Sequence, residues 1–164
     1  MTGLFFEELA PGLVVRHAVR RTVTETDNLL FTTLTMNPQP LHLDEEFARA
    51  SMFGQRIVNS VFTLGLVAGI HVADLTLGTT AGNLAFESVQ FPKPVLVGDT
   101  IRVESTVLDA RPSSKRPDTG VVRFEHRAYN QRDELVCVLQ RAALMLRRPA
   151  TAAPLDERHP DGAL

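Results

Sequence analysis

The segment that most constrains the fold is residues 57–75, which is apolar nearly all the way round a helix. A helix without a polar face must be buried on most of its sides. Full burial of a Val, Leu, Ile or Phe side chain contributes roughly 1.5–3 kcal/mol, whereas each glycine in a helix interior costs about 1 kcal/mol. Burial therefore outweighs the cost of Gly65 and Gly69. We expect a long buried helix, around which a sheet wraps closely because small residues recur along it.

The second half of the chain has the pattern of an antiparallel sheet. Turn material separates four strand-like runs, at residues 84–91, 100–109, 120–129 and 135–146. From Val122 to Ala128, charged residues alternate with His and apolar residues, which predicts one buried and one solvated face. The last run is apolar on both faces, so we expect it to lie centrally. Such alternation is typical of antiparallel strands.

The first half contributes a strand and short helices. Residues 12–23 mix Val and Leu with Arg and His and are expected to form a partly exposed strand. Thr24 followed by Asp27 resembles a helix N-cap with an acidic first turn, which predicts a helix at 25–34. Asp44 can cap a second short helix that ends at Ala50. The sequence therefore predicts an α+β domain at residues 1–148, with an antiparallel sheet wrapped around a long central helix.

Residues 149–164 hold several prolines and few large apolar residues, so we expect a disordered C-terminal tail. The formal charge is −2, with 17 Lys+Arg and 19 Asp+Glu well mixed. This balance gives no excess of positive charge that would indicate binding to nucleic acid or to an anionic membrane. The sequence shows no apolar stretch that would span a bilayer and no signal-peptide pattern. Cys137 is the single cysteine, so we expect a cytoplasmic protein without disulfides or a zinc site.

The segment M-N-P-Q-P-L-H-L-D, residues 36–44, is the candidate site. Pro38 and Pro40 fix φ and disfavour the helical region for the residue before each of them, so we expect extended rather than helical backbone. Such a segment between two helices can direct Asn37, Gln39 and His42 towards a ligand.

Three segments together resemble one known family. They are F-T-T-L-T-M-N-P-Q-P-L-H-L-D-E-E-F-A-R-A at 31–50, F-G-Q-R-I-V-N-S at 53–60, and F-P-K-P-V-L-V-G-D at 91–99. In order and spacing they resemble the MaoC-like, R-specific enoyl-CoA hydratase family over residues 5–148. Within it, the N-P-Q-P-L-H form is most similar to the branch of mesaconyl-CoA hydratase and β-methylmalyl-CoA dehydratase.

The resemblance implies a hot-dog fold and a hydro-lyase that adds or removes water at the 2,3-position of an enoyl-CoA thioester. A branched or dicarboxylic acyl group such as mesaconyl is a candidate. Coenzyme A belongs to the substrate, and the resemblance implies no separate cofactor and no metal. Hot-dog relatives pair their sheets, which covers an exposed strand edge, so a homodimer or a higher even oligomer is expected.

The family's roles transfer to particular residues. Its histidine falls on His42, which would activate water. Its aspartate falls on Asn37, an amide that can only orient or polarise. The backbone N–H of Ser60 would lie at the N-terminus of the long helix and stabilise the enolate-like thioester oxygen. Gln39 keeps an amide of the motif, and Asn59 precedes Ser60 where the family has a His-Gly pair.

Other residues extend the site by chemistry alone. Arg56 is a candidate partner for a substrate carboxylate, and Lys93 is a candidate for the phosphates of coenzyme A, as are the basic residues of loop 111–119. A surface position explains Arg56 equally well, and for Lys93 and the loop residues a solvated surface is the commoner explanation. His42 can also simply brace its loop, and Asn37 and Gln39 are ordinary turn formers.

Two further histidines, His71 and His126, are expected to be satisfied core residues, and Cys137 to be an inert small apolar residue. Two alternative functions stay open beside the hydratase. Because Asn37 replaces the aspartate, the chain can be a non-catalytic acyl-CoA-binding protein or the partner subunit of an active homologue. A hot-dog thioesterase fits less well, since the placement P-x-P-L-H is that of the hydratases.

Overall fold

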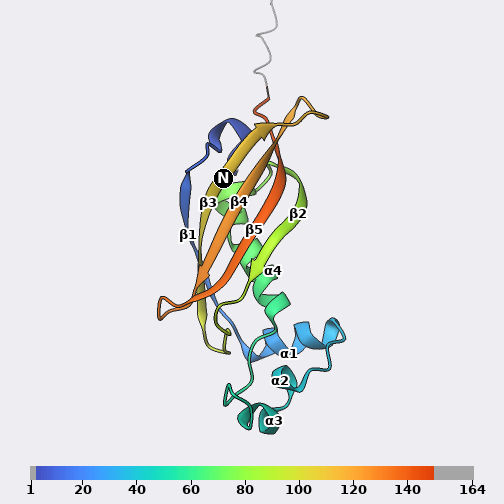
Figure 1. The fold of residues 1–164 in the computed structure, drawn as a ribbon, viewed down its shortest axis with the longest axis vertical. Helices are drawn as coiled ribbons and strands as arrows, with labels where there is room; N and C mark the ends of the chain where they lie inside the picture. The colour runs from blue at the N-terminus through green and yellow to red at the C-terminus, as the bar shows by residue number, and fades with distance from the viewer. Residues whose placement is uncertain (1–2, 150–164) are drawn as a thin grey trace, which may run out of the picture.

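A five-stranded antiparallel sheet curves along one side of a helix in the computed structural model, which describes residues 3–149 (Figure 1). The strands are β1 (Val14–Thr22), β2 (Thr80–Gln90), β3 (Thr100–Pro112), β4 (Thr119–Tyr129) and β5 (Leu135–Leu146). Their order is β1-β3-β4-β5-β2, and every neighbouring pair is antiparallel. The predicted α+β architecture is confirmed, with β4 in the middle, β5 beside it, and β2 at one edge.

The helical segments lie mainly between β1 and β2. They are the 3₁₀ turn η1 (Phe6–Glu8), then α1 (Glu25–Leu34), α2 (Pro40–Leu43), α3 (Glu45–Arg49), α4 (Ser60–Ile70) and the π-helical turn η2 (Val72–Thr76). Two predicted caps are confirmed. The Thr24 hydroxyl accepts the N–H of Asp27 at 3.2 Å and begins α1, and the Asp44 carboxylate accepts the N–H of Phe47 at 3.0 Å and begins α3.

The prediction of extended backbone throughout residues 36–44 is wrong for its second half. Gln39 has extended dihedrals, φ −65° and ψ 116°, as the residue before a proline should. Pro40, however, is the first residue of α2, where its missing N–H costs nothing and its fixed φ suits a helix. His42 therefore projects from a helical turn.

The expected long buried helix is shorter and less covered than the sequence predicted. The α-helical part begins at Ser60 and ends at Ile70, and the chain continues as the π-helical turn η2. Thr63, Val67 and Ile70 are buried, but Val61 is 57% exposed. The sheet covers one side of α4 rather than encircling it within the single chain (Figure 1).

Two apolar clusters fill the space between the helix and the sheet. One surrounds α4 and includes Val67, Ile70, Ile101 and Leu139. The other lies towards η1 and η2 and includes Leu9, Leu75, Val107, Phe124 and Met145. The predicted alternation in β4 is confirmed, because Val122, Phe124, His126 and Ala128 are all buried.

Cys137 lies in the first cluster, fully buried, and burial raises the pKa of its thiol to about 11. The expected burial among apolar residues is confirmed, and the inertness of the thiol stays a prediction. Within residues 3–149, the longest helices are too short or too polar to cross a membrane. The tail predicted from residue 149 lies outside the described residues except for Pro149 itself.

Gly120 offers a test of the packing between η1 and β4. A Cβ at Gly120 would overlap the ring of Phe6, whereas a Cβ at Gly82, in the edge strand β2, would meet nothing within 4 Å. We expect Gly120→Ala to lower the free energy of unfolding by about 1–3 kcal/mol, the usual cost of overpacking. Gly82→Ala is the matched control and should be neutral or slightly stabilising. Urea unfolding measures both, and equal stabilities would contradict the packing.

Candidate functional site

The side chain of His42 makes one hydrogen bond within residues 3–149, and this bond determines its tautomer. Its Nδ1 lies 2.9 Å from the carbonyl oxygen of Ile57. A carbonyl can only accept, so Nδ1 carries the proton, and in the neutral ring Nε2 keeps its lone pair. The ring is partly buried. An imidazole in this state can accept a proton through Nε2, which is what a general base requires.

A buried amide, Asn28 of α1, ties the site together. Its Nδ2 donates to the carbonyl oxygens of His42 at 3.2 Å and of Ile57 at 3.3 Å. Its Oδ1 accepts the N–H of Asn59 at 2.9 Å. Asn28 therefore fixes α1, α2 and the start of α4 relative to one another. The sequence analysis missed this residue, although Asn28 and Thr32 are spaced i, i+4 and so mark a polar, buried face on α1.

The start of α4 presents an unused backbone donor. Asn59 is the N-cap, and its Oδ1 accepts the N–H of Val61 at 3.0 Å while its Nδ2 donates to the Thr32 hydroxyl at 3.3 Å. Ser60 follows as the first helical residue and is exposed. Its N–H makes no hydrogen bond within residues 3–149. This donor lies at the positive end of the helix dipole and can bind an oxygen that gains negative charge.

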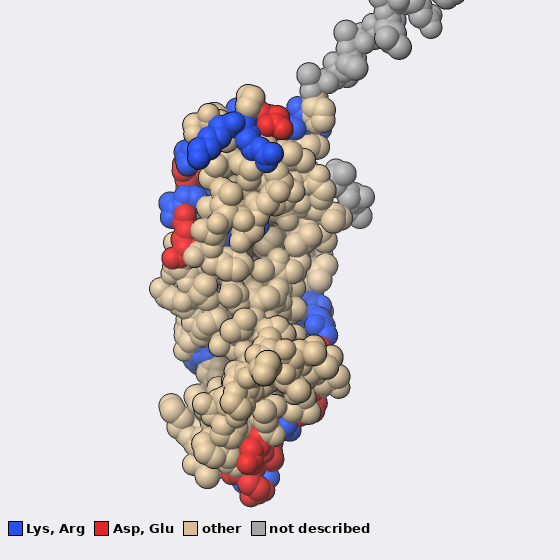
Figure 2. All heavy atoms as spheres, turned by 90° about the vertical axis from the view of Figure 1, so that its right-hand side faces the viewer, with Lys and Arg blue, Asp and Glu red and all other residues tan. Residues whose placement is uncertain are grey.

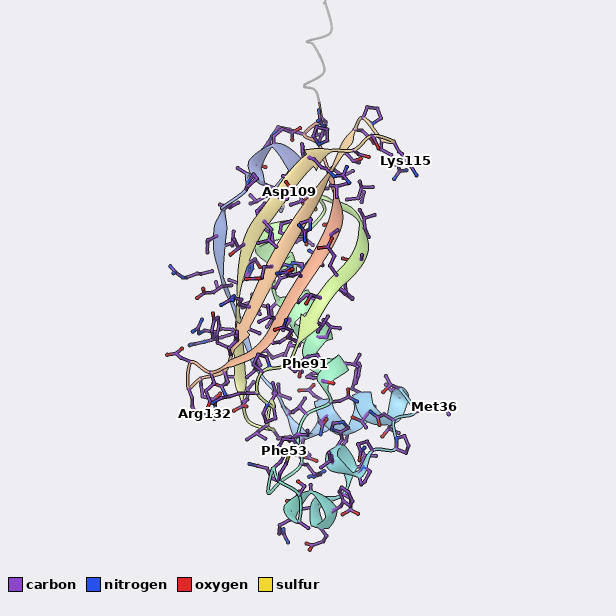
Figure 3. All side chains as sticks on the ribbon, viewed as in Figure 1. Met36, Phe53, Phe91, Asp109, Lys115 and Arg132 are labelled. Carbon is purple, nitrogen blue, oxygen red and sulfur yellow. The ribbon has the colours of Figure 1, made fainter. Side chains whose placement is uncertain are left out.

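Ser60 lies at the wall of a pocket of about 360 Å³, with Lys93 also lining it. The remaining lining is mostly apolar and includes Phe53, Phe91 and Val136. Figure 3 shows Phe53 and Phe91 on the side of the molecule where α4 begins. His42 is not on this wall, but Ile57, whose carbonyl holds the ring, is. The pocket can take an apolar group next to the helix N-terminus.

Asn37 and Gln39 shape a turn in the single chain. The Asn37 Oδ1 accepts the N–H of Gln39 at 3.0 Å, and the Asn37 N–H donates to the carbonyl of Thr32 at 3.0 Å. The neighbouring Met36 has a positive φ of 55° and lies at the outer end of α1, away from the sheet (Figure 3). The simpler interpretation as turn formers thus has direct support, and a role in water orientation stays a prediction.

The two candidate cations are both paired with carboxylates. Arg56 Nη1 lies 2.6 Å from Glu25 Oε1, and its Nε lies 2.8 Å from Glu45 Oε2. Its charge is thereby compensated inside the chain, which weakens its case as a substrate-carboxylate partner. Lys93 Nζ pairs with Glu134 at 2.7 Å but is more than half exposed and lines the pocket. Of the two, Lys93 remains better placed to contact a ligand.

Replacing Asn28 tests its bridging role. Asn28→Ala removes three hydrogen bonds at a buried position, and at roughly 1 kcal/mol for each bond we expect the free energy of unfolding to fall by about 3 kcal/mol. Thr26→Ala, an exposed position on the same helix, is the control and should change stability little. Chemical denaturation measures both variants. A loss below about 1 kcal/mol for Asn28→Ala would contradict the bridge.

Comparison with known proteins identifies relatives with this fold. Mesaconyl-CoA hydratase of Cereibacter sphaeroides is 37% identical over 152 residues, which is 93% of this chain. The chain spans only 43% of that relative's length. The crystal structure of a MaoC-like dehydratase from Rhodospirillum rubrum superposes with a TM-score of 0.79 at 34% identity, covering 90% of this chain and 100% of that one.

The fold itself is that of the hot-dog proteins. A conserved protein of Mycobacterium tuberculosis with a double hot-dog fold superposes with a TM-score of 0.81 at 22% identity, covering 92% of this chain and 46% of that one. This confirms the predicted hot-dog fold, in which the sheet curves along one side of a central helix. Residues 7–133 match the family described as MaoC like domain. The chain therefore belongs to the MaoC-like family.

Proposed function

We propose that the chain is an acyl-CoA hydratase or dehydratase, adding or removing water at the 2,3-position of an enoyl-CoA thioester. The observation that carries the proposal is the hydrogen bond between His42 Nδ1 and the carbonyl of Ile57. Ile57 lies three residues before Ser60, whose N–H is free within residues 3–149 at the N-terminus of α4, so the bond holds the imidazole near this donor. A base and an oxyanion donor are the two groups that this reaction needs. The names of the relatives, a mesaconyl-CoA hydratase and a MaoC-like dehydratase, support the same chemistry.

The reaction follows from these two groups. His42 Nε2 takes a proton from water as the water oxygen bonds to the β-carbon of the enoyl thioester. The electron pair of the double bond moves towards the thioester, and the N–H of Ser60 with the α4 dipole stabilises the oxygen that becomes negative. The imidazolium then returns the proton to the α-carbon. A single imidazole can serve both transfers, because the ring nitrogen that accepts the proton can also return it.

Asn37 supports a second candidate, an acyl-CoA-binding protein without catalysis. The family's aspartate is absent at this position, and the Asn37 Oδ1 is engaged by the N–H of Gln39. General acid–base assistance is typically worth 10²–10⁴ in rate, so an amide here lowers activity unless the imidazole suffices. The pocket next to Ser60 would still bind an acyl group in that case.

We also propose that two copies of the chain pair through the edge strand β2. Leu84 and Phe86 are exposed on this edge by 54% and 48%. Figure 2 shows that the side of the molecule carrying β2 has a broad uncharged middle between charged ends. An unpaired apolar edge of this kind is a site of strand pairing. The relative with a double hot-dog fold carries two such units in one chain, which fits a pair.

The proposed substrate is a small acyl-CoA, and the proposed location is the cytoplasm. The buried, unpaired thiol of Cys137 suits a reducing compartment.

Replacing His42 tests the mechanism. We expect His42→Ala to lower kcat for hydration of crotonyl-CoA and mesaconyl-CoA by about 10²–10⁴, measured as the loss of enoyl-thioester absorbance. Asn37→Asp should keep or raise the rate, since it supplies a carboxylate. Undiminished turnover in His42→Ala would remove the ring from the mechanism. If the unaltered protein binds acyl-CoA but the enoyl-thioester absorbance does not fall, the chain is a non-catalytic acyl-CoA-binding protein. Release of free coenzyme A thiol would identify a thioesterase.

A charge on the edge strand tests the pairing. We expect the unaltered chain to be dimeric or a higher even oligomer and Leu84→Lys to shift it towards monomer, because a lysine on an edge blocks strand addition. Leu30→Lys is a matched control on α1, where Leu30 is 56% exposed. Light scattering after gel filtration gives the mass of each variant. A monomeric unaltered chain, or two variants with the same mass, would contradict pairing through β2.

A further inference from the structure

A second pocket lies at the other end of α4, where the helix passes into η2. Its volume is about 330 Å³, and it is lined by Ala68, His71, Asn83, Phe86 and Arg141, among others. His71 follows Ser60 by eleven residues, which is about 16 Å along a helix at 1.5 Å per residue. The pocket therefore lies apart from the candidate site within the single chain.

Arg141 brings a buried positive charge to this pocket. It lies on the inner face of β5, in phase with Leu139 and Ala143, and is only 4% exposed. It forms no ion pair with a carboxylate within residues 3–149. Burial lowers the pKa of its guanidinium to about 10, so the group stays charged at neutral pH. Buried charges in proteins are normally paired, because an unpaired one is costly.

A chain of hydrogen bonds holds the guanidinium in a fixed orientation. Arg141 Nε donates to His126 Nε2 at 3.0 Å, so His126 Nδ1 carries the proton and donates to the Ser105 hydroxyl at 2.6 Å. The hydroxyl then donates to His17 Nε2 at 2.7 Å, and His17 Nδ1 donates to Asp74 at 3.2 Å. Burial lowers the pKa of both histidines, which fits neutral rings. Asp74 is thus reached only through three neutral groups.

The same bonds confirm that His126 is a satisfied core histidine, but the corresponding expectation for His71 is wrong. His71 stacks on His126 with ring centroids 4.2 Å apart and planes 7° apart. It is 3% exposed, and its Nδ1 has no hydrogen-bond partner within residues 3–149. Burial, followed by the nearby charge of Arg141, lowers its pKa to about 3, so the ring is neutral. An unsatisfied buried nitrogen costs about 1–3 kcal/mol.

A further polar group of the pocket, besides the hydroxyls of Thr76 and Thr80, is an amide. Arg141 Nη1 donates to Asn83 Oδ1 at 3.1 Å, and Asn83 lies on the edge strand β2. With Nε directed to His126 and Nη1 to Asn83, the guanidinium is preorganised while its charge lacks a direct counterion. The apolar part of the lining includes Ala68, Val72 and Phe86. One cation, several neutral polar groups and an apolar wall lie around a single cavity.

We propose that this pocket binds the carboxylate of a small organic anion, with Arg141 as its charge partner. Asn83 supplies a further polar contact, the His71 ring forms part of the wall with its Nδ1 enclosed, and the apolar wall takes the carbon skeleton. A single guanidinium balances one negative charge and matches the planar geometry of a carboxylate. A phosphate dianion would leave an uncompensated charge in a mainly apolar cavity.

This site stands whether or not the chain is a hydratase. The carboxylate can come from a free acid or from the far end of a dicarboxylic acyl thioester, and both sources present the same group to Arg141. Valerate and its neutral amide, valeramide, test the shared chemistry. Glutaryl-CoA and valeryl-CoA, which differ by a terminal carboxylate, distinguish the sources.

The experiment is calorimetric titration of the full chain, its Arg141→Met variant and the control Arg127→Met, an exposed arginine paired with Glu125. We expect valerate to bind the unaltered chain and Arg127→Met with equal affinity, and valeramide to bind neither. Arg141→Met should bind valerate at least tenfold more weakly than the unaltered chain. Valerate binding that is absent, matched by valeramide or unchanged in Arg141→Met would overturn the proposal. The two thioesters are compared only if valerate passes this test. If glutaryl-CoA binds more tightly than valeryl-CoA, and this difference disappears in Arg141→Met, the carboxylate comes from a thioester. If the two thioesters bind equally, it comes from a free acid.

Two further measurements separate binding from folding and from catalysis. Arg141→Met should still unfold in one cooperative transition without ligand, with a melting temperature lowered only by the loss of the donor to buried His126 Nε2, because Met has a similar length. Asn83→Leu, at a more exposed position, should weaken valerate binding without a change in melting temperature. His42→Ala should bind valerate normally even if it abolishes hydration, so failure of the proposed function would leave this site intact. Unchanged affinity in Asn83→Leu would contradict the assigned geometry.

Discussion

The three hydrogen bonds of the Asn28 amide are the interaction on which the proposed active site depends. The turn α2 has only four residues, too few to hold a side chain in place by its own backbone bonds. Asn28 supplies what the turn lacks, because it binds the carbonyls of His42 and Ile57 and the N–H of Asn59. The Asn28 side chain is fully buried, and hydrogen bonds are stronger in such an environment than in water. The position of the catalytic candidate is thus determined by a helix distant from it in sequence.

Features that depend on neighbouring residues could be predicted from the sequence. The caps at Thr24 and Asp44 involve partners three residues away, and the burial of alternate residues in β4 follows from its period of two. Proline at position 40 shows the limit of this reasoning. The same residue disfavours a helix before it and favours one after it, so the local rule could not decide where the extended backbone ends.

Features that depend on distant contacts could not be predicted. The sequence indicates Arg56 as a candidate partner of a substrate carboxylate, yet Glu25 and Glu45 reach it from the helices α1 and α3. The tautomer of His42 depends on a carbonyl fifteen residues away. The position of Arg141 is visible in the sequence, since a charged residue falls on the inner face of an otherwise apolar strand. Its significance required the fold, which shows that no carboxylate of residues 3–149 pairs with it.

The two ends of α4 present positive charge in different ways, one through exposed backbone N–H groups and the other through a buried side chain. At Ser60 the helix itself provides partial positive charge through unused N–H groups, at no desolvation cost because the residue is exposed. Beyond Ile70 the positive charge is a whole guanidinium, and it is buried. A chain selected for stability alone would replace Arg141 and His71 by apolar residues, which pack without desolvation. Their burial next to an open cavity is understandable if a ligand completes the missing interactions, and stability is then restored only when that ligand is bound.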